Sequence, residues 1–318
     1  MSEDLKSQSW SAFRRGEILE AKTLAVQAIE IDGAPPSATA YPSTCILEGL
    51  KFSLQGSKAE SFDKYDHVLG LEPENQMARL LLHEDLKKEV NTRPRRKEGS
   101  GKIVFGLGTG RMGSTSIAGQ LGKIDNAFVS HEHYPIVRWK EDFNTVAWHL
   151  ERMSLLADLF GLVADISHWW LPYAERIIEH LENSSFLCVR RSKQETVDSF
   201  LKIKGGGGQG SINHWVDHDG TFFQLNSWDA TYPSYSAFEL SECLEKYWDE
   251  YYETASSLQK RFPDRFLLVD FEEMKSPLGR EKVAEFLGLS GQLSSPLPAM
   301  NVGSTGDSAN FSVNPYVR

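Results

Sequence analysis

A glycine-rich stretch with one cation and two hydroxyl residues is the part of the sequence best suited to chemistry. Segment 103–117 reads IVFGLGTGRMGSTSI, an apolar run followed by glycines and then by a helical pattern. Glycines let the backbone curl so that successive N–H groups and a helix N-terminus converge on an anion. Ser114 and Thr115 add hydroxyl donors. The stretch therefore predicts a phosphate-binding loop between a strand and a helix.

The loop differs from that of ATP-using enzymes in the position of its cation. Gly108 and Gly113 have the G-x-x-x-x-G spacing of such loops, but Ser114 follows where a lysine is required. The cation is instead Arg111, inside the loop. This difference counts against a P-loop kinase or another enzyme that hydrolyses nucleoside triphosphates.

A second cationic segment has the features of another anion site. Segment 186–199 reads FLCVRRSKQETVDS, an apolar strand that ends in two arginines and is followed by a helix. Arg191 and Ser199 are eight residues apart, and a guanidinium gives bidentate, charge-assisted hydrogen bonds to a phosphate. Arg190 takes the place of Arg191 if the strand ends one residue earlier. The segment predicts a second phosphate site on an element next to the first.

Together these segments resemble the PAPS-dependent sulfotransferase superfamily. Its 5′-phosphosulfate loop has Lys or Arg, a variable residue, Gly and two Ser or Thr residues, and its 3′-phosphate motif has Arg at a strand end and Ser eight residues later. The resemblance implies 3′-phosphoadenosine 5′-phosphosulfate (PAPS) as the sulfuryl donor. No metal is required, because the loop N–H groups and Arg111 neutralise the phosphosulfate. The implied donor-binding residues are Gly110, Arg111, Met112, Gly113, Ser114, Thr115, Arg191 and Ser199.

Three further segments resemble the family in order. Segment 163–170 is similar to the strand end that usually reads Asp-Lys-Ser, with Ile166 in the place of the lysine. Segments 266–274 and 283–289 are similar to a late strand with an acidic turn and to a helix ending in Phe-Leu-Gly. The resemblance spans about residues 102–289.

Transfer to a hydroxyl group needs a general base near the loop. Glu132 follows the second predicted strand, and in the members of the family that use Glu the base comes about 21 residues after the loop cation. The spacing from Arg111 to Glu132 is 21. Glu132 is therefore the first candidate, with His131 and His133 as alternatives. The His-Glu-His run does not predict a metal site, because adjacent residues of an extended segment point to opposite faces.

Strands and helices alternate after residue 102, which predicts the α/β class with a parallel sheet flanked by helices. The predicted strands are 103–107, 127–130, 162–165, 186–189 and 266–270, and the predicted helices are 114–121, 170–181, 194–203, 239–262 and 280–287. The resemblance narrows this class to the P-loop-like sulfotransferase fold. The carboxyl ends of the strands are then the expected ligand-binding edge.

The domains predicted are an all-α segment 1–92, a linker 93–101 and a catalytic domain 102–318. Segment 59–82 resembles the second half of a tetratricopeptide repeat, and segment 20–32 a degenerate copy. Two hairpins are fewer than the roughly three repeats that stand alone, so we expect them to pack on the next domain. They form either a structural cap or a groove for a protein partner.

Composition limits the remaining choices. A net charge of −10 argues against a nucleic-acid binder, and no stretch reaches the length of a membrane-spanning helix. Three cysteines without C-x-x-C spacing fit a reducing compartment, and a cytoplasmic location is expected.

The expected acceptor is a small molecule, a carbohydrate or a carrier-bound alcohol, with tyrosine or a phenol as the other choice. Segment 204–220, with four consecutive glycines, is either a lid over the acceptor or a surface insertion. The alternative functions are a P-loop nucleotide kinase and a non-catalytic nucleotide-binding scaffold.

Overall fold

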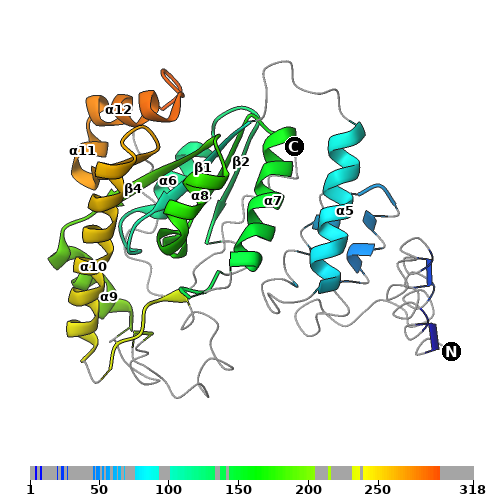
Figure 1. Ribbon diagram of the computed structural model, residues 1–318, viewed down its shortest axis with the longest axis horizontal. Coiled ribbons are helices and arrows are strands. Elements are labelled where there is room, and N and C mark those ends of the chain that lie inside the picture. Colours follow the sequence, from blue (N-terminus) through cyan, green and yellow to red (C-terminus); the bar gives the residue numbers. More distant parts are fainter. Residues whose placement is uncertain are drawn as a thin grey trace. The chain divides into compact units, whose positions relative to one another are not determined.

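The computed structural model divides the chain into two compact units, Met1–Pro94 with Asn314–Arg318 and Arg95–Val313, and each is described by itself (Figure 1). The described residues are 76–92, 101–132, 137–140, 143–204, 214–215, 231–236 and 239–293, with scattered residues between 4 and 68. The predicted linker 93–101 lies outside this part of the chain except for Gly101. The sheet and the candidate site belong to the larger unit.

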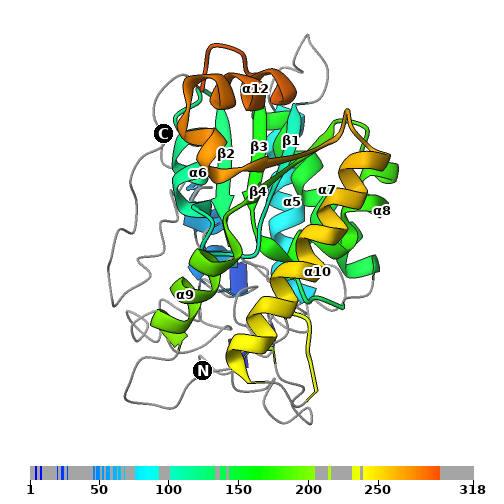
Figure 2. The same cartoon turned by 90° about the vertical axis from the view of Figure 1, so that its left-hand side faces the viewer.

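The larger unit contains a five-stranded sheet in which all strands are parallel, so the predicted α/β class with a parallel sheet flanked by helices is confirmed. The strand order is β2-β3-β1-β4-β5, with β1 at the centre (Figure 2). The strands are β1 Lys102–Leu107, β2 Ala127–His131, β3 Leu162–Ile166, β4 Ser184–Arg190 and β5 Phe266–Asp270.

Helices connect the strands and cover the sheet. They are α6 Ser114–Leu121, α7 Phe143–Leu159, the 3-10 helix η1 His168–Tyr173, α8 Ala174–His180, α9 Lys193–Lys204, α10 Leu240–Arg261, α11 Phe271–Lys275 and α12 Pro277–Leu287. The single helix predicted for 170–181 is wrong in its first four residues, which belong to η1 with Pro172 inside it. Proline has no N–H to donate within a helix, so the regular α-helix begins only after it.

The core consists of two layers, one on each face of the sheet, because side chains alternate along a strand. On one face Val104, Leu187 and Val269 pack with buried residues of α6, α11 and α12. On the other face the rings of Phe105 and Phe186 stack at 4.8 Å. Figure 2 shows α7, α8 and α10 on this second side. The helices cover both faces of the sheet, and the segments that connect strands to helices lie at the carboxyl ends of the strands.

All five strands end at the same edge, and backbone hydrogen bonds fix the segments that follow them. The N–H of Glu132, after β2, donates to the Ile166 carbonyl at 3.1 Å, and the N–H of Ser167, after β3, donates to the Gly106 carbonyl at 2.8 Å. The residues after β1, β2 and β3 are therefore held side by side.

The smaller unit is described mainly by α5, Gln76–Thr92. Ala78, Leu82 and Leu86 are buried at helical spacing, and Tyr65 is fully buried in the same unit. Much of segment 1–75 lies outside the described residues, so the tetratricopeptide-like repeat stays a prediction. No helix in the described part of the chain is long and apolar enough to cross a membrane.

Candidate active site

The predicted phosphate loop joins the central strand β1 to α6. Gly110 and Gly113 have φ values of 85° and 92°, in the left-handed region that favours glycine. A Cβ atom on Gly113 would lie 2.5 Å from the Phe271 ring, so a larger residue does not fit there. Gly113 is also the N-cap of α6 and supplies no side-chain hydrogen bond. The first N–H groups of α6, including that of Ser114, are therefore without a capping side chain and can receive an anion.

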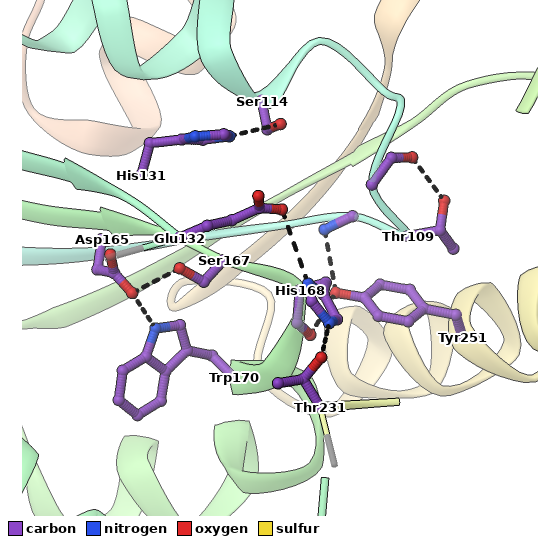
Figure 3. Close-up of polar contacts among 12 residues, drawn as sticks. Thr109, Ser114, His131, Glu132, Asp165, Ser167, His168, Trp170, Thr231 and Tyr251 are labelled. Carbon is purple, nitrogen blue, oxygen red and sulfur yellow. Dashed lines mark hydrogen bonds and ion pairs between the residues drawn. The ribbon is translucent and has the colours of Figure 1, made fainter. Parts of the chain in front are cut away.

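Core contacts and two tyrosines hold the loop in place. The Met112 side chain is buried in the hydrophobic core, so only its backbone can contact a ligand. The Gly108 N–H donates to the Tyr251 hydroxyl at 3.0 Å, and that hydroxyl donates to the His168 carbonyl at 3.1 Å (Figure 3). The Tyr252 hydroxyl accepts from the Thr109 N–H at 3.5 Å. Helix α10 thus fixes the start of the loop.

The second predicted anion site lies directly beside the loop. Arg111 Nε donates to Ser199 Oγ at 3.1 Å, and an Arg191 guanidinium N–H donates to the Arg111 carbonyl at 3.1 Å. Arg190 is engaged elsewhere, because its guanidinium donates to both carboxylate oxygens of Asp270 at 2.7 and 3.2 Å. Arg191, rather than Arg190, is therefore the arginine placed next to the loop.

The two guanidinium groups at this site repel each other. Burial lowers the pKa of Arg111, the Glu132 carboxylate and Tyr232 raise it, and the charge of Arg191 lowers it further, so that the net direction is downward. An anion bound between Arg111 and Arg191 would offset the repulsion and the loss of hydration. Arg191 Nε also lies 3.3 Å from a Glu195 carboxylate oxygen, so the charge of the Arg111–Arg191 pair is partly balanced by Glu195 and Glu132.

Glu132 is in an unusual backbone conformation directly after β2. Among the described residues three non-glycine residues have a positive φ, namely Arg111 at 56°, Asn126 at 58° and Glu132 at 48°. Left-handed backbone costs energy in a residue with a Cβ atom and is often retained where it places a functional group. Two of the three are thus the candidates for the loop cation and the general base.

The Glu132 carboxylate is 28 % exposed and lies against His168. Glu132 Oε1 and His168 Nδ1 are 3.8 Å apart, an electrostatic contact slightly too long for a hydrogen bond (Figure 3). Burial alone would raise the pKa of Glu132, but the contact with His168 and the positive charges of His131 and Arg111 outweigh burial and lower it. Glu132 is therefore held as a carboxylate, the form that a general base requires.

The two histidines beside Glu132 in sequence have different positions. His131 Nε2 lies 2.8 Å from Ser114 Oγ, a hydrogen bond that joins the end of β2 to the first residue of α6 (Figure 3). His131 therefore orients one of the predicted phosphate-binding hydroxyls. His133 lies outside the described residues. Thr115 follows Ser114 in the first turn of α6.

Asp165 and Ile166, at the end of β3, are buried and support the site from below. The Asp165 carboxylate accepts hydrogen bonds from Ser167 at 2.8 Å and from the Trp170 indole (Figure 3). It also accepts one from Ser130 at 2.7 Å. Ile166 is fully buried, close to Gly106. The position where the family commonly has a lysine is thus part of the core in this chain.

Sequence reasoning did not single out His168 and Thr231. His168 Nε2 lies 3.0 Å from Thr231 Oγ1, and the His168 ring stacks on Tyr232 with a centroid distance of 4.3 Å. His168 could have been found, because it is a polar residue just after a strand, the same signal that identifies Glu132. Thr231 carries no such signal, because it follows a long segment of no regular pattern.

Most of the predicted lid 204–220 lies outside the described residues. Within it His214 and Trp215 are buried, and the Trp215 ring lies 4.5 Å from that of Tyr232. This part of the segment therefore packs close to His168 and Glu132. In the described part of the chain no group of three or more His, Cys, Asp or Glu residues is arranged to hold a metal ion.

The structure brings Arg111, Ser114, Glu132, Arg191 and Ser199 to one edge of the sheet through the contacts above. Comparison with known proteins does not identify a family for this chain. No protein-family model matches the chain, and no curated protein matches it.

Proposed function

We propose that the protein is a sulfotransferase that moves a sulfuryl group from PAPS to an acceptor hydroxyl. The observation that carries the proposal is the convergence on Arg111 of Ser199, which accepts from its guanidinium, and of Arg191, which donates to its carbonyl. Two cationic groups and a hydroxyl beside the uncapped start of α6 suit a nucleotide with phosphate on both the 3′ and 5′ positions.

The residues present fit the donor in the following way. The backbone of Gly110–Gly113 and the N–H and hydroxyl groups of Ser114 and Thr115 would hold the 5′-phosphosulfate, with Arg111 as the cation. Arg191 and Ser199 would hold the 3′-phosphate, which distinguishes PAPS from ordinary adenine nucleotides. His131 orients Ser114 for this contact.

The chemistry then needs a base, and Glu132 has the required charge and position. Glu132 takes the proton of the acceptor hydroxyl while the acceptor oxygen forms a bond to sulfur. The bond from sulfur to the 5′-phosphate oxygen breaks, and adenosine 3′,5′-bisphosphate leaves. Arg111 and the loop N–H groups stabilise the negative charge that develops on the leaving oxygen.

A carbohydrate or another alcohol is the acceptor that we favour, with a phenol as the second choice. Tyr232 and Trp215 lie close to the Glu132–His168 contact and offer aromatic surface on which a sugar ring can pack. Aromatic surface also suits a phenol, so the acceptor panel in the test below includes both classes.

The test is a transfer assay with ³⁵S-labelled PAPS and a panel of sugar, alkyl and phenolic alcohols. We expect the wild-type protein to label at least one class and Glu132→Gln to lose labelling by about 10²-fold or more. Glu132→Gln should still bind adenosine 3′,5′-bisphosphate. Glu175→Gln, which changes an exposed carboxylate paired with Arg261, is the matched control and should keep full activity.

A nucleotide kinase is the alternative, and the same protein preparation distinguishes it. A kinase would hydrolyse or transfer the γ-phosphate of ATP in the presence of Mg²⁺ and would transfer no sulfuryl group. Position 114, where such an enzyme needs lysine, is a serine bound to His131. We therefore expect no phosphoryl transfer.

A further inference from the structure

His168 is placed between the candidate base and a hydroxyl group inside the protein. Its Nδ1 atom lies 3.8 Å from Glu132 Oε1, and its Nε2 atom lies 3.0 Å from Thr231 Oγ1. The imidazole is buried and is stacked on Tyr232 with an angle of 13° between the rings. One ring nitrogen therefore faces a carboxylate that can exchange a proton with it, and the other faces a hydroxyl group that can hydrogen-bond to it. Stacking on Tyr232 restricts rotation of the imidazole ring.

The contact with Thr231 is linked to which form of the imidazole meets Glu132. The Thr231 hydroxyl can donate to Nε2, in which case Nδ1–H points at Glu132 and favours its carboxylate, or it can accept from Nε2–H, in which case the lone pair of Nδ1 faces the Glu132 carboxyl group. That is the form able to accept a proton from Glu132 after Glu132 has been protonated. The separation of 3.8 Å needs to shorten by about 1 Å, as is common when a ligand closes a site.

The other groups that face Glu132 are unsuited to this step. Arg111 is a cation and cannot accept a proton. His131 Nε2 is held by Ser114 at 2.8 Å, and burial raises the pKa of Tyr232, which keeps the phenol neutral. His168 is thus the neighbour of Glu132 with a ring nitrogen directed at its carboxyl oxygen.

We propose that His168 receives the proton that Glu132 removes from the acceptor, with Thr231 as the positioning residue that fixes the imidazole for this step. The inference rests on the function proposed above. The O–H bond of the Glu132 carboxylic acid breaks and an N–H bond to Nδ1 forms, which leaves a carboxylate and an imidazolium. After the sulfated product departs, the proton returns through Glu132, whose side chain is 28 % exposed, to water.

The first test does not depend on turnover. Full-length protein labelled with ¹⁵N-histidine is compared with Glu132→Gln and Thr231→Val, with adenosine 3′,5′-bisphosphate absent and present, and the ¹⁵N shifts report which ring nitrogen carries the proton. We expect Glu132→Gln to change the Nδ1 resonance of His168 and Thr231→Val to change its Nε2 resonance. The buried His149 ring on α7 is the internal control and should not change in either variant. An Nδ1 resonance that is the same in wild type and Glu132→Gln overturns the relay.

The second test uses turnover. His168→Asn keeps a polar group near the Nδ1 position but cannot accept a proton, and we expect kcat to fall by about 10²-fold with the KM for PAPS unchanged. Thr231→Ser should keep the wild-type rate, and Thr231→Val should lower kcat by about tenfold.

The outcomes separate the relay from the function on which it rests. If the wild-type protein transfers sulfuryl groups and His168→Asn keeps kcat within about twofold, the relay is wrong and the function stands. If the wild-type protein neither binds the bisphosphate nor transfers a sulfuryl group, the function is wrong. In that case only the ¹⁵N shifts of His168 test whether Glu132 and His168 share a proton.

Discussion

At the scale of single residues, the ionisation of Glu132 depends on the groups around it. Its pKa is lowered in the folded protein, although burial opposes this, because His168, His131 and Arg111 favour the carboxylate. A group whose pKa is lower folded than unfolded stabilises the fold above its ordinary pKa, here 4.5, and this stabilisation is lost as the pH falls below that value.

This linkage predicts how Glu132→Gln changes with pH. The free energy of unfolding of the wild-type protein should fall more steeply than that of the variant between about pH 5 and pH 3, because only the wild type loses a stabilising carboxylate. Urea unfolding at a series of pH values measures the difference. A difference that is constant through this range would contradict the lowered pKa.

Arg191 and Arg190 form a natural matched pair for testing the second anion site. Arg191→Ala should weaken the binding of adenosine 3′,5′-bisphosphate by about tenfold or more, since it removes a charge-assisted hydrogen bond to phosphate. Arg190→Ala should leave that affinity nearly unchanged, because Arg190 binds Asp270. Isothermal titration calorimetry measures both. Equal losses in the two variants would mean that the site is misassigned.

At the scale of elements, helix α10 supports the phosphate loop through Tyr251. Its hydroxyl accepts the Gly108 N–H and donates to the His168 carbonyl, so one side chain links the loop to the segment after β3. Tyr247 lies one turn earlier on the same helix, and its buried hydroxyl has no hydrogen-bond partner among the described residues.

The comparison of Tyr251→Phe with Tyr247→Phe isolates this support. Tyr251→Phe leaves a buried N–H without an acceptor and should lower the free energy of unfolding by about 1–3 kcal/mol. It should also weaken bisphosphate binding. Tyr247→Phe should be neutral or slightly stabilising, because it removes a buried hydroxyl that makes no hydrogen bond. Chemical denaturation of both variants checks the prediction, which fails if their effects are the same.

Most of the sheet could be predicted from the sequence, because buried parallel strands are short apolar runs bounded by turn residues. All five predicted strands are present, with ends that differ by two residues or fewer. Helix α7 was not predicted, although Leu150, Met153 and Ala157 recur at the spacing of a buried helix face and are buried in the structure. The break at Pro172 was missed because the preceding residues also have an apolar, helix-like pattern.

The site residues could be predicted only where a charged side chain comes shortly after the end of a strand. Arg111, Glu132 and Arg191 lie close to strand ends, and the rule that ligands bind at the carboxyl edge finds them. The contact between Glu132 and His168 depends on β2 lying next to β3, which the sequence does not specify. The pairing of His168 with Thr231 joins residues 63 apart, and no local pattern links them.

At the scale of the whole molecule, the anion site is a local feature of a protein with a net charge of −10. The residues that we propose to bind the nucleotide belong to the unit Arg95–Val313. Hydrogen exchange of the full chain with and without adenosine 3′,5′-bisphosphate should therefore slow at residues 108–115 and 190–199. Exchange in α5, which belongs to the other unit, should not change. Protection confined to α5 would place the ligand elsewhere.

Calorimetric titration of the wild-type protein with three nucleotides tests the proposed donor site most directly. We expect adenosine 3′,5′-bisphosphate to bind at least about tenfold more tightly than 5′-AMP, because only the bisphosphate offers a phosphate to Arg191 and Ser199. We also expect ATP with Mg²⁺ to bind more weakly than the bisphosphate. An affinity for 5′-AMP equal to that for the bisphosphate, or tighter binding of ATP with Mg²⁺, would contradict the proposed donor site.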